Sequence, residues 1–139
     1  MKAIRLAHVA VAADQGQDLL KVLRQLGLEA VEPEAVPGDG VAVQMVAIGP
    51  DRLELLTATG PDTAVGRFVA ARGVGLHHLA IEVDDLRAAL GQLRASGVRL
   101  VDEEPRIGAG GRRIAFLHPA SCGGVLIELC EREDGTTLG

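Results

Sequence analysis

Apolar and polar residues alternate along part of the chain and recur at helical spacing in the next part. The alternating stretch over residues 3–12 predicts a strand. Leucines and valines at helical spacing then follow Asp14, a candidate N-cap, and predict a helix. The apolar stretches 41–48 and 52–57 flank a Gly-Pro-Asp turn and predict a hairpin. With a weaker strand over 28–36, the first half is predicted as strand, helix and three strands.

The second half of the chain shows the same order of patterns. A connecting helix is predicted within 59–74, with Pro61 in its first turn and Gly73 at its end. After it come a strand that starts at Gly75, a helix over about 85–96 capped by Asp84 or Asp85, a strand over 98–102, and a hairpin formed by 112–118 and 124–130. The prediction is a single domain over 1–139, with module 1 at about 3–58 and module 2 at about 75–131.

Specific residues repeat together with these patterns. His78 lies 70 residues after His8 in a similar apolar strand, and Gly97 lies 70 residues after Gly27 at the end of each predicted helix. Each module also ends in a strand that contains a glutamate, Glu54 or Glu128. Self-similarity at a fixed spacing indicates an internal duplication. The two histidines and two glutamates are expected to converge if the modules pack around a pseudo-twofold axis.

The strand from Gly75 contains two adjacent histidines that point to opposite faces, because successive side chains of a strand alternate. One face carries Leu76, His78, Ala80 and Glu82, and the other carries His77, Leu79, Ile81 and Val83. The second set is the more apolar and is expected to face the core. His78 is the stronger candidate for chemistry, since the repeat places Ala7 at the position of His77.

Composition narrows the possible partners. The chain has 139 residues and a net charge of −5, which argues against nucleic acid and anionic membranes as partners. No apolar run reaches the roughly 20 residues of a membrane span, and no signal-peptide pattern is present, so a cytoplasmic protein is expected. Cys122 and Cys130 are expected to be reduced, since their spacing fits neither a disulfide framework nor a metal-binding pair.

The repeated histidines and glutamates are the candidate chemistry. A single His or Glu on a strand is usually a hydrogen-bonded or solvent-facing residue. Four of them placed symmetrically by a repeat favour a metal site instead, with His8, Glu54, His78 and Glu128 as ligands. Imidazole and carboxylate donors suit a divalent ion; Co²⁺ is the first candidate, and Mn²⁺, Ni²⁺ and Zn²⁺ are alternatives. Such an ion would polarise a bound carbonyl.

These residues also carry a family resemblance. The repeated His and Glu pattern resembles the vicinal oxygen chelate superfamily, which includes glyoxalase I and ring-cleaving dioxygenases. Within it, residues 4–131 resemble the methylmalonyl-CoA epimerases. The segments that carry this likeness are Gly75-Leu-His-His-Leu-Ala-Ile-Glu-Val-Asp-Asp, Asp102-Glu-Glu-Pro-Arg-Ile-Gly-Ala-Gly-Gly, Ile114-Ala-Phe-Leu-His-Pro and Gly123-Gly-Val-Leu-Ile-Glu-Leu.

The resemblance implies a fold, a reaction and a site. The fold would be α+β, with two tandem βαβββ modules forming a curved mixed sheet around a metal-binding cleft, usually in a homodimer. The reaction would interconvert (R)- and (S)-methylmalonyl-CoA, an acyl-CoA thioester, by removal and return of the α proton through a metal-stabilised enediolate. His8, His78 and Glu128 would bind the metal, with Glu54 as the remaining ligand, and Glu128 would be one catalytic base.

The chain departs from the family at the second base. Many members have a glutamate that would align with Val43, and valine cannot transfer a proton. Glu34, Asp39, His118 or a metal-bound water is left as the partner acid. A hydrogen-bonded residue at the end of a hairpin is the simpler interpretation of His118.

Two other questions stay open in the sequence. Arg112 and Arg113 beside the glycine-rich turn 108–111 are candidates for contacts with CoA phosphates, although solvated arginines at a hairpin turn are an equal alternative. The alternative functions are a glyoxalase-I-like lactoylglutathione lyase and a small-molecule-binding protein without catalysis. The segment from Asp102 to Glu128 argues against the lyase, and the four retained candidate ligands argue against the binding protein.

Overall fold

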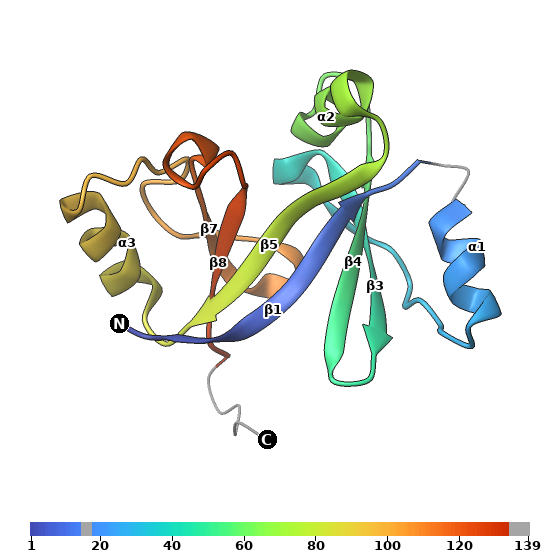
Figure 1. The fold of residues 1–139 in the computed structure, drawn as a ribbon, viewed down its shortest axis with the longest axis horizontal. Helices are drawn as coiled ribbons and strands as arrows, with labels where there is room; N and C mark the ends of the chain where they lie inside the picture. Colours follow the sequence, from blue (N-terminus) through green and yellow to red (C-terminus); the bar gives the residue numbers. More distant parts are fainter. Residues whose placement is uncertain (15–17, 134–139) are drawn as a thin grey trace. The chain divides into compact units, whose positions relative to one another are not determined.

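The computed structural model describes residues 1–14 and 18–133, which contain three α-helices and eight strands (Figure 1). The chain forms two compact units. One, here called the His8 unit, is His8–His77; the other, the His78 unit, combines Met1–Ala7 with the chain from His78 onward. Strands β1 (Ala3–Ala12) and β5 (Gly75–Val83) each contribute residues to both units.

The His8 unit contains two helices and a mixed set of strands, and the first helix packs on the strands. Its elements are the end of β1, α1 (Asp18–Gln25), β2 (Glu34–Val36), β3 (Val41–Ile48), β4 (Asp51–Ala58), α2 (Ala64–Arg72) and the start of β5. The strand order is β2-β3-β4-β1, and only the β4–β1 pair is parallel. Leu20 and Leu23 of α1 pack with Val11, Val46 and Leu55 and form the core.

The His78 unit has the same construction. Its elements are the start of β1, the remainder of β5, α3 (Leu86–Ala95), β6 (Arg106–Ile107), β7 (Arg113–Leu117) and β8 (Ile127–Glu131). The strand order is β5-β8-β7-β6, and β5 and β8 are parallel. Leu86 and Leu90 of α3 pack with Val83, Leu117 and Leu129. The predicted α+β class and the repeated strand–helix–strand order are confirmed.

The internal duplication extends to individual hydrogen bonds. After α1, the Gly27 N–H donates to the Arg24 carbonyl at 3.0 Å, and the Leu28 N–H donates to the Leu23 carbonyl at 3.1 Å. After α3, Gly97 and Val98 make the same two bonds to Arg94 and Leu93, at 3.0 and 3.0 Å. Gly27 and Gly97 have φ values of 83° and 87°. Both helices therefore end in the same Schellman motif.

Gly97, just after α3, and Gly91, inside α3, allow a matched stability prediction. Gly97→Ala is expected to lower the free energy of unfolding by about 1–2 kcal/mol, because a Cβ strains a left-handed residue. Gly91→Ala, on the exposed side of α3, is expected to raise it by about 0.5–1 kcal/mol, because alanine favours the helix. An added Cβ meets no heavy atom within 4 Å at either position, so steric contact does not confound the comparison. Urea denaturation of both variants measures the difference, and a destabilised Gly91→Ala would contradict it.

Two predicted elements differ from the structure. Helix α2 begins at Ala64 rather than at Pro61, because the Thr63 hydroxyl accepts the Gly66 N–H at 3.0 Å and caps the helix there. The predicted strand over 98–102 is wrong, since only an isolated bridge between Leu100 and Leu117 forms. The N-cap assigned to Asp14 concerns a helix start at residues 15–17, which lie outside the described residues.

The predicted core face of β5 packs against α3, with Val83 buried and Ile81 partly buried, but the opposite face is buried as well. His78, Ala80 and Glu82 are buried, whereas Leu79 and Ile81 are only partly buried. The face that carries His78 is covered because Ala80 packs with Ala7, Ile114 and Cys130 in a second core cluster. Both faces of β5 are thus occupied, and the chemistry-bearing face is the more deeply buried. None of the helices in the described part of the chain has the length and apolar character needed to cross a membrane.

Candidate metal centre and active site

His8 and Glu54 form a buried pair within the His8 unit. Ala10 of β1 is the register partner of Glu54 on β4, so His8, two residues before Ala10, presents its side chain on the same face as Glu54. The His8 Nε2 atom lies 3.4 Å from the Glu54 Oε2 atom. The two residues are 8% and 5% exposed, so neither glutamate nor histidine faces solvent as a lone strand residue would.

His78 and Glu128 form the equivalent pair within the His78 unit. Ala80 of β5 is the register partner of Glu128 on β8, which repeats the relation between Ala10 and Glu54. The His78 Nε2 atom lies 3.2 Å from the Glu128 Oε2 atom, and each residue is 5% exposed. The duplication therefore produces the same imidazole–carboxylate geometry in both units.

Both pairs lie on the face of their strands that the packed helix does not cover. In the His8 unit, helix α1 packs on Val11 and Leu55, which are odd-numbered neighbours of the pair. In the His78 unit, α3 packs on Val83 and Leu129, again of opposite parity to the pair. Because side chains alternate along a strand, the histidines and glutamates point away from the helices.

The donor set fits a divalent metal ion. Burial of a carboxylate is costly unless a cation or hydrogen bonds compensate for lost water. Two donor atoms at right angles and about 2.1 Å from one ion lie about 3 Å apart, close to the imidazole–carboxylate separations in both units. Nitrogen and oxygen donors of this kind bind Co²⁺, Mn²⁺, Ni²⁺ or Zn²⁺. Each unit thus supplies one imidazole and one carboxylate that suit such an ion.

The second oxygen of Glu128 has a different partner from the first. The Cys130 thiol donates to Glu128 Oε1 at 3.0 Å, while Oε2 faces His78. The sequence interpretation assigned Cys130 no role beyond being reduced. The sequence does contain a signal for this contact: Cys130 is two positions after Glu128 on the same strand, so the two side chains lie on the same face. Cys130 is 1% exposed, so this hydrogen bond is shielded from water.

Glu82 is a further buried acid that sequence reasoning left without a role. It is 1% exposed and accepts hydrogen bonds from Arg5 and from Arg112, the latter at 3.2 Å. Arg112 also donates to the Glu131 carbonyl at 2.9 Å, and its side chain is 15% exposed. Arg112 is therefore committed to an internal ion pair and is poorly placed for a phosphate.

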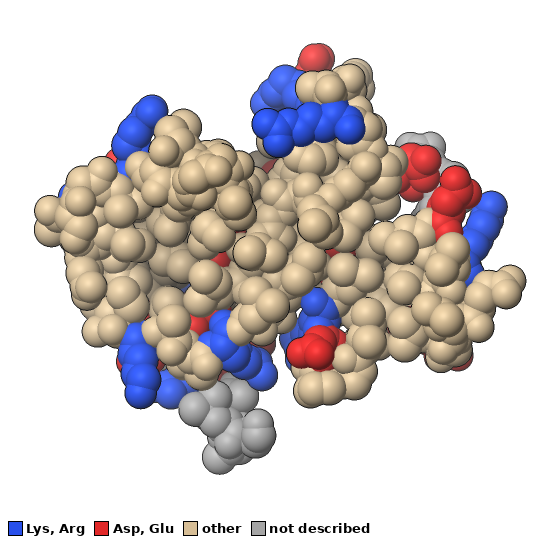
Figure 2. All heavy atoms as spheres, in the orientation of Figure 1, with Lys and Arg blue, Asp and Glu red and all other residues tan. Residues whose placement is uncertain are grey.

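Other arginines are more accessible. The Arg113 side chain is 52% exposed and lies 3.9 Å from Glu131. Figure 2 shows basic side chains at the surface over α2, where Arg67 and Arg72 are exposed. Among the described residues, Arg72 stacks on the Phe68 ring at 5.6 Å, and Arg67 donates to the Asp62 carbonyl at 2.9 Å.

The candidates for the second acid differ in their positions. Val43 is buried in β3, and its register partner on β2 is Glu34, which is exposed. Directly opposite residues in antiparallel strands present their side chains on the same face. His118 uses its Nδ1 to accept the Ala120 N–H at 3.0 Å and caps a short turn, which agrees with its simpler interpretation. Asp39 lies in a 3-10 turn between β2 and β3.

Comparison with known proteins gives consistent matches. The family model for the glyoxalase/bleomycin resistance protein/dioxygenase superfamily matches residues 7–116. Mitochondrial methylmalonyl-CoA epimerase of Bos taurus is 40% identical over 127 residues, which cover 90% of this chain and 73% of that protein. Ethylmalonyl-CoA/methylmalonyl-CoA epimerase of Cereibacter sphaeroides is 35% identical over 128 residues, covering 90% of this chain and 96% of that protein.

A solved structure matches equally well. A substituted variant of the Streptomyces coelicolor methylmalonyl-CoA epimerase, in complex with 2-nitronate-propionyl-CoA, has a TM-score of 0.90 and 34% sequence identity. The match covers 98% of this chain and 99% of that one. The family model and the similarity of sequence and fold over at least 90% of this chain confirm the resemblance seen in the sequence.

Proposed function

The chain belongs to the methylmalonyl-CoA epimerases of the glyoxalase/bleomycin resistance protein/dioxygenase superfamily, and on this premise we propose that it interconverts (R)- and (S)-methylmalonyl-CoA. The α proton between a thioester and a carboxylate is weakly acidic. A carboxylate on one side removes it, and a second acid on the other side returns a proton. The observation that carries the proposal is Glu128, a buried carboxylate beside His78 in a chain of this family.

Glu128 is the proposed base. Its two oxygens are differentiated, since Oε2 faces His78 and Oε1 accepts the Cys130 thiol hydrogen bond. This arrangement holds the carboxylate in one rotamer, so little reorganisation is needed when it accepts a proton. Its 5% exposure leaves little water around the carboxylate.

The proposed metal ligands are His8, His78 and Glu128, with Glu54 as the remaining ligand. A divalent ion bound there, with Co²⁺ as the first candidate, would supply Lewis acidity toward the oxygen atoms of the substrate. The role of the protein side chains is to hold four donors in fixed rotamers. The strand register that pairs Ala10 with Glu54 and Ala80 with Glu128 supports this role.

Glu34 is proposed as the second acid. The strand register connects Glu34 to the strand of Glu54: Glu34 lies opposite Val43, and Val43 lies opposite Leu56. Leu56 is two residues from Glu54 on the same strand, so Glu34 and Glu54 are on one face. The acid missing at Val43 is thus replaced by one on the neighbouring strand.

The proposed substrate is an acyl-CoA thioester, and the proposed assembly is a homodimer, as in the family resemblance. Arg113 is the better of the two named arginines for a CoA phosphate. Its side chain is 52% exposed, against 15% for the side chain of Arg112, which is bonded to Glu82.

Proton exchange tests the function directly. Protein loaded with Co²⁺ is incubated with (S)-methylmalonyl-CoA in D₂O, and the α-proton signal is followed by NMR together with the other epimer. Loss of the signal and appearance of the (R) epimer, both stopped by a chelator, are expected. No exchange with any of the four candidate ions would overturn the epimerase proposal.

Glu34→Gln tests the second acid in the same assay. Epimerisation is expected to fall by roughly 100-fold, the usual contribution of one general acid. Exchange without inversion is expected to persist for one of the two epimers, because the other base is intact. Glu32→Gln, an exposed glutamate two residues earlier, is the matched control and should leave both rates unchanged. An unchanged epimerisation rate in Glu34→Gln would exclude Glu34 as the acid.

A further inference from the structure

We propose that Asp102, Arg106 and Phe116 form an assembly that fixes the orientation of the His78 imidazole. All four residues belong to the His78 unit, and three of them come from the segments Asp102–Arg106 and Ile114–Pro119. The value of this orientation for catalysis rests on the proposed function. The orientation itself does not, so the two can fail separately.

Phe116 contacts His78 directly. The two rings meet edge to face, with centroids 5.2 Å apart and planes at 88°. Phe116 lies on β7 opposite Glu128, the partner of His78, so one side chain flanks both members of the pair. An edge-to-face contact has a preferred geometry, and it therefore restrains rotation of the imidazole plane.

The backbone of Phe116 is held by the segment that starts at Val101. The Phe116 N–H donates to Asp102 Oδ2 at 2.8 Å, and its carbonyl accepts the N–H groups of Val101 and Asp102 at 2.9 and 3.2 Å. Both backbone groups therefore point away from Glu128. Phe116 and Glu128 are then a non-hydrogen-bonded pair, the kind in which side chains of neighbouring antiparallel strands come closest.

The Arg106 guanidinium lies over the face of the Phe116 ring. Its guanidinium carbon lies 5.5 Å from the Phe116 ring centroid, and its Nε donates to Asp102 Oδ1 at 3.0 Å. The two oxygens of Asp102 thus connect the Phe116 backbone to the cation over the Phe116 ring. The Asp102 and Arg106 side chains are 17% and 34% exposed, so this ion pair is partly shielded from water.

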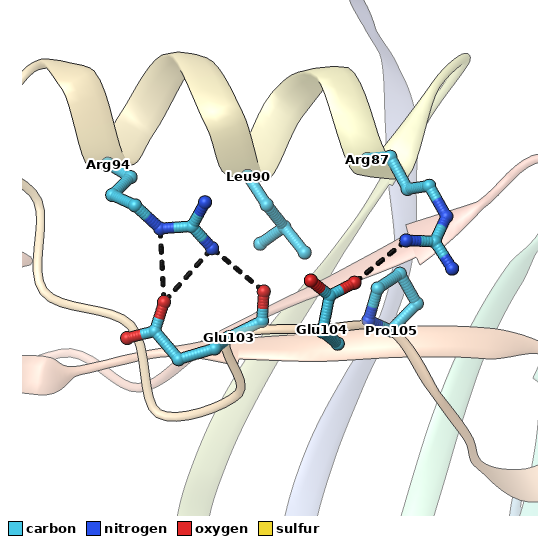
Figure 3. A pocket seen from close by; sticks show the side chains of 6 residues that line it. All are labelled: Arg87, Leu90, Arg94, Glu103, Glu104 and Pro105. Carbon is cyan, nitrogen blue, oxygen red and sulfur yellow. Dashed lines mark hydrogen bonds and ion pairs between the residues drawn. The ribbon is translucent and has the colours of Figure 1, made fainter.

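Residues 103–105, which follow Asp102, are attached to helix α3 by surface ion pairs. Figure 3 shows a small pocket between α3 and Glu103–Pro105, with Arg94 bonded to Glu103 and Arg87 bonded to Glu104. These four side chains are 51–72% exposed, and such surface pairs contribute little stability. They provide a control, because breaking one changes the same segment without touching Asp102, Arg106 or Phe116.

The duplication provides a second comparison. In the His8 unit, Met45 takes the register position opposite Glu54 that Phe116 takes opposite Glu128. The chain has only two phenylalanines and no tyrosine or tryptophan. An aromatic side chain at this position is thus a feature of one module, and the assembly is specific to His78.

The test uses full-length Phe116→Leu and Arg106→Gln, with Arg94→Gln as the control. The first readout is the imidazole NMR signals of His78 in metal-free protein, assigned by their loss in His78→Gln. Doubled or broadened signals are expected in both test variants, but not in the control. The second readout is Co²⁺ binding by calorimetry, with Kd expected to rise roughly 10-fold, as for residues that orient metal ligands. The third is kinetics, where kcat should fall and KM should change little.

Phe116→Tyr keeps the ring and is expected to restore all three readouts. If Phe116→Leu does not fold, Arg106→Gln and Asp102→Asn decide the question, since neither removes core volume. A folded variant with a lower Tm but unchanged His78 signals and Co²⁺ affinity would show that these residues only stabilise the core. That result would overturn the proposal. If the wild-type protein binds no Co²⁺, the proposed metal site fails, while the metal-free imidazole signals still decide the positioning proposal.

Discussion

Replacing Glu128 by glutamine is expected to lower the rate of epimerisation by roughly 10³-fold, within the range for loss of a general base. Glutamine is close in volume and keeps one carbonyl oxygen, but its amide cannot accept a proton. The buried position, 5% exposed, gives little room for water to replace the carboxylate. Inversion should decline in both directions, whereas α-proton exchange should be lost only for the epimer whose α proton faces Glu128, because the second acid still serves the other epimer.

The control for this prediction lies on the same strand. Glu131→Gln removes an acid from β8 that is three residues away and pairs with exposed Arg113. Its epimerisation rate should match the wild type. A Glu128→Gln protein that retains more than about a tenth of wild-type activity would show that another group is the base, because such a loss is below that of a typical general base.

Adjacent histidines permit an equally specific test of the metal site. His78→Ala is expected to raise the Kd for Co²⁺ by more than about 100-fold, since mutation of residues that only hydrogen-bond to metal ligands already changes metal affinity by about 10–100-fold. His77→Ala is expected to leave the Kd unchanged. His77 points to the opposite face of β5 and contacts the Phe68 ring, with centroids 4.9 Å apart.

Calorimetry on metal-free proteins measures both values, and circular dichroism verifies that both variants fold. A similar loss of affinity in the two variants would mean that the strand, rather than the His78 imidazole, is needed. Unchanged affinity in His78→Ala would remove this histidine from the proposed ligand set. Activity of the two variants should follow the same order as their Co²⁺ affinity.

Much of the fold was predictable because the sequence contains an internal duplication. His8 with His78 and Gly27 with Gly97 set an offset of 70 residues, at which the helix ends repeat, and the glutamate strands repeat the same register at an offset of 74. The repeat distinguishes His78 from His77, because it aligns Ala7 with His77. A local pattern suffices to predict where these helices end, because helix termination depends on residues close together in sequence.

Other features depended on distant contacts. The apolar character of Ile81 and Val83 identified the face that packs against α3, but not the burial of the opposite face, where Ala7, far away in sequence, packs with Ala80. The segment 98–102 reads as a strand, yet the Asp102 side chain takes the Phe116 N–H that a strand neighbour would have bonded. Tertiary competition of this kind overrides propensity and cannot be read from one segment alone.

The division of β1 between two units has a consequence for synthesis. Lys2 exchanges hydrogen bonds with Asp84, Arg5 bonds Glu82, and Ala7 packs with Ala80. During synthesis these partners are made only at residues 80–84, whereas the partners of the second half of β1 are complete by Leu56. Residues 8–77 can therefore assemble during translation before residues 2–7 meet their partners.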